Sequence, residues 1–269
     1  MNVSFEKKTF ASRQKAMIAT DFRRMFTTPL YYIMVGISLI IPILILVMTS
    51  MMNGTTSVDP QTGAISTFEG FKSVWQIIGS LPSTDPAAGM SMDITTMCNI
   101  NMMFFLIAVF VCLFVGEEFR SGYAKNLFTI KANKTDYIIS KSLAGFVAGV
   151  SMIVAFFVGA MLGGAFAGLP FALDGVTAGN IVMSMLSKIF LVAIFSSIYL
   201  LACVIAKQRL WLSLIASFGV GMLFFTMIPI ISPLNATFVN VLLCFVGGGL
   251  FSGGIGVGSY YILKKTNIL

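Results

Sequence analysis

The sequence predicts an all-α, polytopic membrane protein with six transmembrane helices. Hydrophobic residues make up 57% of the chain and charged residues only 10%, whereas a typical soluble domain is about a quarter charged. Apolar runs of about twenty residues recur along the chain, which is the length needed to cross a hydrocarbon core of roughly 30 Å. Lys and Arg gather in alternate connecting segments, as they do in the cytoplasmic loops of membrane proteins.

The first 29 residues precede the first apolar run and are polar and basic. Phe10, Met17, Phe22 and Phe26 recur there at roughly helical spacing among Lys and Arg residues. This pattern predicts an amphipathic helix on the cytoplasmic membrane surface, and a solvated basic tail is the alternative. A transmembrane domain then covers residues 30–269, with spans predicted at 30–52, 98–115, 143–167, 181–206, 210–231 and 238–263.

The connections between the spans predict the orientation of the chain. Residues 53–97, rich in Gly, Pro, Ser, Thr and Asp, are predicted to form a long outer loop, and residues 116–141 a charged cytoplasmic segment. Fifteen of the seventeen Lys and Arg fall in the amino-terminal segment, in residues 116–141 and 207–209, and in the carboxyl-terminal tail. Because positive residues mark the cytoplasmic side, both termini are expected there, in a multi-pass protein of the cell membrane.

Composition disfavours several classes of function. The net charge of +7 does not indicate nucleic-acid binding, because the basic residues are dispersed among short segments. The chain has no histidine, and its four cysteines are widely spaced, so we predict no metal site. It lacks the P-loop motif G-x-x-x-x-G-K-[ST] and any cluster of polar catalytic residues. We therefore expect a non-catalytic chain that binds no cofactor itself.

Charges within the spans are rare. Ion-coupled transporters usually carry intramembrane carboxylates or histidines, and the predicted spans contain neither. Lys188 is the one charge inside a span, and its position near the outer end predicts that its side chain snorkels to the interface. An ion or substrate role is the alternative for Lys188, and an ion-coupled secondary transporter or channel is the alternative for the chain.

Prolines and glycines predict how the helices end and pack. Pro229 and Pro233 are expected to end the fifth helix before it meets the outer surface. Small-x-x-x-small spacing lets helix backbones approach closely and predicts a compact bundle. The pairs with this spacing are Gly145 and Gly149, Gly159 and Gly163, Gly164 and Gly168, Gly249 and Gly253, and Gly254 and Gly258.

The segment after the second span reads Gly116-Glu117-Glu118-Phe119-Arg120-Ser121-Gly122-Tyr123-Ala124-Lys125-Asn126-Leu127. Its acidic pair, basic residue and glycine resemble the coupling helix of the permeases of type-2 ABC (ATP-binding-cassette) exporters. The sequence from Asp136 to Lys141, the six spans, the basic amphipathic amino-terminal helix and the long outer loop also fit that family. The chain departs from the family pattern at residues 130–134, Ile-Lys-Ala-Asn-Lys, where many relatives have a proline and an arginine.

The resemblance implies a homodimeric permease that exports its substrate, with a separate cytoplasmic ATPase subunit bound to each copy. ATP and Mg would be held by that ATPase. Charged side chains of the coupling segment would make charge-assisted contacts with it, and aromatic ones would act as hydrophobic anchors. An ordinary charged loop is the alternative. The ATPase-coupling residues implied are Glu117, Glu118, Phe119, Arg120, Gly122, Tyr123 and Lys125.

In this family the first, second and fifth spans line the substrate route. Flexible methionines and aromatic faces suit an adaptable apolar surface, although lipid-facing or packing roles are the alternative for each residue. We expect a hydrophobic or amphipathic cargo and favour a small amphipathic peptide over a lipid or a drug, by resemblance to the branch that exports amphipathic or antimicrobial peptides. The candidate path residues are Met48, Met51, Met52, Met102, Met103, Phe104, Phe105, Met222, Phe224 and Phe225.

Overall fold

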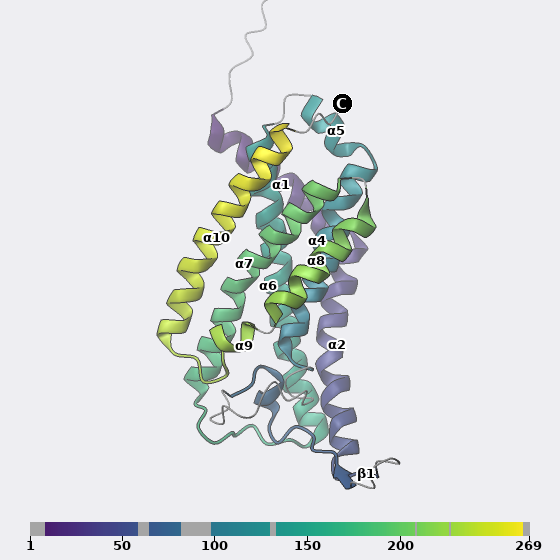
Figure 1. The fold of residues 1–269 in the computed structure, drawn as a ribbon, viewed down its shortest axis with the longest axis vertical. Helices are drawn as coiled ribbons and strands as arrows, with labels where there is room; N and C mark the ends of the chain where they lie inside the picture. The colour runs from purple at the N-terminus through teal and green to yellow at the C-terminus, as the bar shows by residue number, and fades with distance from the viewer. Residues whose placement is uncertain are drawn as a thin grey trace, which may run out of the picture.

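The computed structural model describes residues 9–58, 65–81, 98–129, 133–207, 209–225 and 227–265. These residues form a bundle whose long helices run along one axis (Figure 1), which confirms the predicted helical membrane fold. The helices are α1 (Phe10–Thr27), α2 (Pro29–Met52), α4 (Met103–Arg120), α5 (Tyr123–Thr129), α6 (Lys134–Ala167), α7 (Ala178–Ala206), α8 (Leu210–Phe225), α9 (Ile228–Ile231) and α10 (Phe238–Lys265).

Short elements lie between the long helices. Strands β1 (Thr56–Val58) and β2 (Ile65–Thr67) pair antiparallel within the long loop after α2. The 3-10 helix η1 (Val74–Ile77) follows them, and η2 (Ile100–Met102) leads directly into α4. The rest of the predicted outer loop, residues 59–64 and 82–97, lies outside the described residues.

Within the described part of the chain, five helices are long and apolar enough to cross a membrane. They are α2, η2 with α4, α6, α7 and α10. Helix α8 is apolar but has only 16 residues, so at 1.5 Å per residue it is about 24 Å long, shorter than a hydrocarbon core. The predicted fifth span, 210–231, is thus divided between α8 and α9. Helix α9 carries Pro229 in its first turn, where the missing N–H is tolerated.

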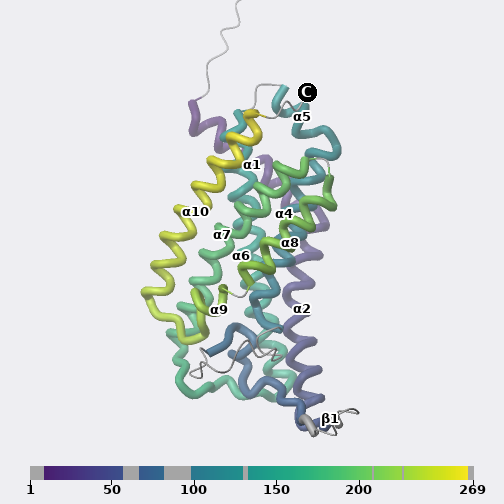
Figure 2. The backbone as a smooth tube through the Cα atoms, viewed as in Figure 1, coloured from purple at the N-terminus to yellow at the C-terminus, as the bar shows by residue number. Residues whose placement is uncertain are grey.

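The two ends of the bundle are built from different segments. Figure 2 shows α1, α5 and the last turns of α10 at one end, and the β1–β2 hairpin at the other. We call these the α5 end and the hairpin end. The described parts of the predicted cytoplasmic segments lie at the α5 end, and the described parts of the predicted outer loops lie at the hairpin end.

Two glycines of α6 let α2 pack closely against it. A Cβ at Gly159 would lie 2.1 Å from the carbonyl oxygen of Leu39, and one at Gly163 would lie 2.7 Å from the Cα of Ile43. This Gly-x-x-x-Gly pair therefore packs a helix backbone, as the spacing predicts. The two pairs on α10 do not, because nothing described lies within 4 Å of a Cβ at Gly249, Gly253, Gly254 or Gly258.

Gly159→Ala is therefore expected to destabilise the bundle by roughly 1–3 kcal/mol, because the added methyl overlaps backbone atoms of α2 that cannot rotate away. Thermal unfolding of the purified protein in detergent measures this change. Gly247→Ala on α10 is the matched control, since no described atom lies within 4 Å of its Cβ. Equal unfolding temperatures for the two variants would contradict close packing of α2 on α6.

Lys188 does not snorkel, contrary to the sequence prediction. Its side chain is completely buried near the hairpin end of α7. The Nζ atom donates hydrogen bonds to Ser184 Oγ at 3.0 Å, to the Ser232 carbonyl at 2.9 Å and to Ser232 Oγ at 3.1 Å. The ammonium group thus has a neutral oxygen for each of its three protons. Lys188 thereby links α7 to the segment that follows α9. This contact could not be predicted from spacing, because Ser232 comes close to Lys188 only in the folded chain.

Candidate functional site

The predicted coupling segment, residues 116–141, begins inside α4. This helix continues to Arg120, and the chain then turns at Ser121 and Gly122 before α5 starts. Gly122 has φ +77°, in the left-handed region that a residue without a Cβ adopts readily. The glycine therefore makes the sharp turn that sets α5 apart from α4. Residues 130–132, which include part of the departure from the family pattern, lie outside the described residues.

Glu118, in the last turn of α4, is buried among three partners from two other helices, α1 and α6. Its Oε2 atom accepts a hydrogen bond from Tyr137 Oη at 2.7 Å. Its Oε1 atom is paired with the Lys141 ammonium and the Arg24 guanidinium. Only 1% of Glu118 is exposed, so this carboxylate is held by internal partners.

Asp21 of α1 completes the cluster. Its Oδ1 atom is paired with Lys141 Nζ, and its Oδ2 atom accepts a hydrogen bond from Ser140 Oγ. Two carboxylates, Asp21 and Glu118, thus meet two cations, Arg24 and Lys141. We call these four residues the charge network. Burying a charge is costly unless the charge is paired. The network can lie inside the protein because its two negative and two positive charges balance.

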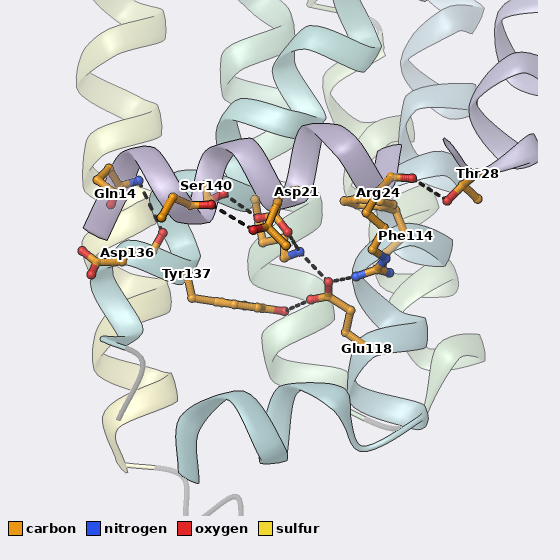
Figure 3. A network of polar contacts seen from close by, with 12 residues as sticks. Gln14, Asp21, Arg24, Thr28, Phe114, Glu118, Asp136, Tyr137 and Ser140 are labelled. Carbon is orange, nitrogen blue, oxygen red and sulfur yellow. Dashed lines mark hydrogen bonds and ion pairs between the residues drawn. The ribbon is translucent and has the colours of Figure 1, made fainter. Parts of the chain in front are cut away.

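The charge network fastens α1 across the bundle. Figure 3 shows α1 crossing the neighbouring helices, with Asp21 and Arg24 directed toward Ser140, Tyr137 and Glu118. Arg24 also donates a hydrogen bond to the Phe114 carbonyl at 2.8 Å. The predicted amphipathic helix therefore exists, but its inner face binds the bundle through charges as well as through the buried Met25.

A second contact holds the beginning of α1. Arg13 Nε lies 3.2 Å from Asp136 Oδ2, and Gln14 Nε2 donates to the Asp136 carbonyl at 3.5 Å. Both acceptor atoms belong to Asp136, in the first turn of α6. Helix α1 is thus attached to α6 at two points along its length and to α4 at one.

Helix α5 rests on the other side of the same network. Ala124 is its buried residue, and the Phe128 ring lies 5.2 Å from the Tyr137 ring, nearly edge-on. Phe119, at the end of α4, lies 6.2 Å from the same ring. Because Tyr137 donates to Glu118, a continuous series of contacts joins α5 to α1.

The predicted coupling residues fall into an outer and an inner set. Glu117, Arg120, Tyr123 and Lys125 are exposed, and Glu117 and Arg120 lie 3.9 Å apart as a surface pair. We call these four residues the outer face. Glu118 and Phe119 are buried, so their side chains face the bundle and not the surface.

An open surface hollow adjoins the outer face. It has a volume of about 510 Å³ and is lined by Arg120, Arg209 and apolar residues that include Trp211. Trp211 lies in the first turn of α8, and Arg209 directly precedes this helix. The hollow therefore brings the 207–209 connection next to the end of α4, two segments that the sequence predicted to share one side of the membrane.

The candidate path residues do not form one lined channel within the described chain. Met48, Met51, Met52, Met222 and Phe224 have exposed side chains on α2 and α8, whereas Met103 and Phe104 are buried inside the bundle. Phe105 links α4 to α8, with its ring 5.4 Å from that of Phe218 and 5.7 Å from that of Phe225. Met102 is half-buried at the end of η2.

Sequence reasoning missed most of the charge network. Its members Asp21, Arg24 and Lys141 come from α1 and α6, far from Glu118 in the chain. One signal was available: Asp21 is the single acidic residue of the otherwise basic α1. A lone carboxylate on the apolar side of an amphipathic helix calls for a buried cation, although its partner could not be named from spacing.

Comparison with known proteins gives one match. The family model described as "ABC-2 family transporter protein" matches residues 17–227, which include α1 from Met17 onward, the charge network and α8. No curated protein and no solved structure matches the chain.

Proposed function

This chain belongs to the ABC-2 transporter family, and on that premise we propose that it is the permease subunit of an ATP-driven exporter. Its cargo would be a hydrophobic or amphipathic substrate, with a small peptide as the leading candidate. The observation that carries the proposal is the family match over 17–227, together with an exposed α5 seated on a buried charge network.

A separate ABC ATPase would supply the energy. The sequence contains no P-loop, so ATP and Mg would bind to the partner and not to this chain. We propose a homodimer of permeases with two ATPase copies, in the cell membrane, with both termini cytoplasmic. The concentration of Lys and Arg in segments at the α5 end supports this orientation.

The outer face and the charge network together support a proposal for how movement of the ATPase reaches the transmembrane helices. An ATPase that docks on Arg120 and Tyr123 would push or pull α5 and the last turn of α4. The Phe128–Tyr137–Glu118 contacts lead from there to Lys141 on α6 and Asp21 on α1. Movement of the docking site would then shift α1, α4 and α6 as one body, which is the two-state element that coupling requires.

The preference for an amphipathic peptide rests on the exposed surface of α2 and α8. Met48, Met51 and Met222 are all more than half exposed, and methionine side chains adapt to apolar ligands of varied shape. A hydrophilic cargo would find few partners there. The second candidate, an ion-coupled transporter, lacks support, because the described carboxylates in the long helices are paired with cations or exposed.

Reconstitution with the partner tests this proposal. The permease should co-purify with a P-loop ATPase expressed alongside it, and amphipathic helical peptides should raise ATP hydrolysis by the reconstituted complex more than small hydrophilic solutes do. The ATPase alone, without permease, is the control. Transport driven by an ion gradient without any ATPase would refute the exporter assignment, and equal stimulation by both solute classes would remove the preference for peptides.

A further inference from the structure

An apolar groove of about 950 Å³ lies between α6, α7 and α10, and none of the outer-face residues and none of the candidate path residues line it. Its walls include Ile139 and Phe146 of α6, Phe190 of α7, and Phe245 and Gly253 of α10. Phe245 is 57% exposed and Leu250, also in the wall, is 72% exposed. The groove is therefore open along its length to the surroundings of the bundle, which for these helices is the bilayer.

Glycines of α10 create the space. Gly249, Gly253 and Gly256 line the groove, and no described atom lies within 4 Å of a Cβ at the first two. The glycines therefore keep this side of α10 narrow, but no described helix packs against Gly249 or Gly253. In this, these two differ from Gly159 and Gly163 of α6, which pack against α2. A flexible hydrocarbon chain is the partner that fits an apolar gap facing lipid.

The mouth of the groove at the α5 end is basic. Tyr260 lines the groove there, and Lys264 follows it by four residues, one turn further along the same face of α10. Lys264 and Lys265 are exposed. On the opposite wall, next to the lining residue Thr135, Lys134 Nζ donates to the Leu263 carbonyl at 2.9 Å, which brings a third ammonium to the mouth.

Acidic groups do not cancel this charge among the described residues. Asp136 is the acidic residue in the first turn of α6, and it is buried in its pair with Arg13. The exposed lysines at the end of α10 therefore leave a net positive mouth. A tyrosine at the headgroup level and basic residues just beyond it are the features that hold an anionic headgroup.

We propose that this groove is a binding site for one anionic phospholipid, with an acyl chain between α6, α7 and α10 and the headgroup at Lys134, Lys264 and Lys265. The apolar wall accommodates the acyl chain of any phospholipid, and charge complementarity at the mouth selects an anionic headgroup over a zwitterionic one. The site is independent of the exported substrate. It would fix α10 to the rest of the bundle along its open side.

Native mass spectrometry of the full chain released from detergent tests the proposal. The probes are phosphatidylglycerol and phosphatidylcholine with identical acyl chains. Retention of phosphatidylglycerol should exceed that of phosphatidylcholine. The double variant Lys264→Gln/Lys265→Gln should lose that preference by roughly tenfold or more, since a surface lysine contributes about a factor of five to binding an anionic lipid. Lys125→Gln/Lys207→Gln removes two exposed charges elsewhere on predicted cytoplasmic segments and should keep the preference.

Filling the groove tests the acyl-chain part. Gly253→Leu should lower retention of both lipids, because its side chain enters open space within the groove. Gly254→Leu, on a neighbouring position outside the groove lining, should retain lipid as the parent does. Equal retention of the two lipids by the parent, or unchanged retention in Gly253→Leu, would overturn the proposal. Loss of dimer mass in Gly253→Leu alone, with lipid retention unchanged, would assign the groove to a second copy of the chain instead.

Discussion

Lys141→Met is expected to destabilise the protein by roughly 3–5 kcal/mol, the usual cost of leaving a buried charge without its partner. Lys141 pairs with both Asp21 and Glu118, and its side chain is wholly buried. Without it, Arg24 alone faces two carboxylates. Loss of monodisperse protein on size exclusion and a fall in unfolding temperature would measure the effect, and α1 should become accessible to protease.

A second variant separates charge balance from packing. Asp21→Asn/Lys141→Met removes one charge of each sign, so the remaining Arg24–Glu118 pair is balanced. Because a buried pair can often be replaced by neutral side chains at little cost, the double variant should recover most of the lost stability. If it is as unstable as Lys141→Met alone, the Lys141 side chain acts through its volume, and the charge network is not the unit that holds α1.

Arg120→Ala/Tyr123→Ala is expected to weaken binding of the partner ATPase about thirtyfold while the membrane fold stays intact. Truncation of a hot-spot residue commonly costs about 2 kcal/mol or more, and Arg and Tyr are enriched at such positions. Both side chains are exposed at the α5 end, and the Tyr123 ring centroid lies 5.8 Å from the Arg24 guanidinium carbon. Neither side chain belongs to the buried core, so the bundle should stay folded without them. Lys125→Ala alone should be mild, since an exposed ion pair is typically worth less than about 1 kcal/mol.

Pull-down of the ATPase and transport into inverted vesicles measure this effect. Glu69→Ala/Lys72→Ala is the matched control, because it removes an exposed 3.2 Å ion pair from the loop at the hairpin end. Phe119→Ala should behave differently, losing stability as well as coupling, since its ring is buried beside Tyr137. Full ATPase binding by Arg120→Ala/Tyr123→Ala would show that the outer face is an ordinary charged surface.

Much of the fold could be predicted from the sequence because local physics decides it. The apolar runs that predicted spans reappear as α2, α4, α6, α7 and α10, since a helix in lipid must satisfy its own backbone hydrogen bonds. The amphipathic α1 likewise follows from side-chain spacing alone. The sequence predicted that the fifth helix ends early, but it did not predict that the span divides into two helices. Pro229 was expected to end the fifth helix, but α8 already ends at Phe225 and Pro229 lies in the first turn of α9.

The candidate site was predictable only in part, because a residue's type does not tell which way its side chain faces. Glu117 and Glu118 are adjacent and chemically alike, yet one is exposed and the other is buried. A helix turns by about 100° per residue, so neighbours necessarily face different surroundings. Which of the two meets the bundle depends on where Lys141 and Arg24 stand, and no local pattern carries that information.

The sequence by itself determined a helical membrane protein of the ABC-2 family, because hydrophobic length, charge placement and the coupling-segment motif are properties of continuous stretches of chain. Only the tertiary structure decided that Asp21 and Lys141 join Glu118, that Lys188 is held by Ser232, and that the glycines of α10 border an open groove. Each of these contacts joins residues far apart in the chain. Their charges and shapes become complementary only after the helices have packed.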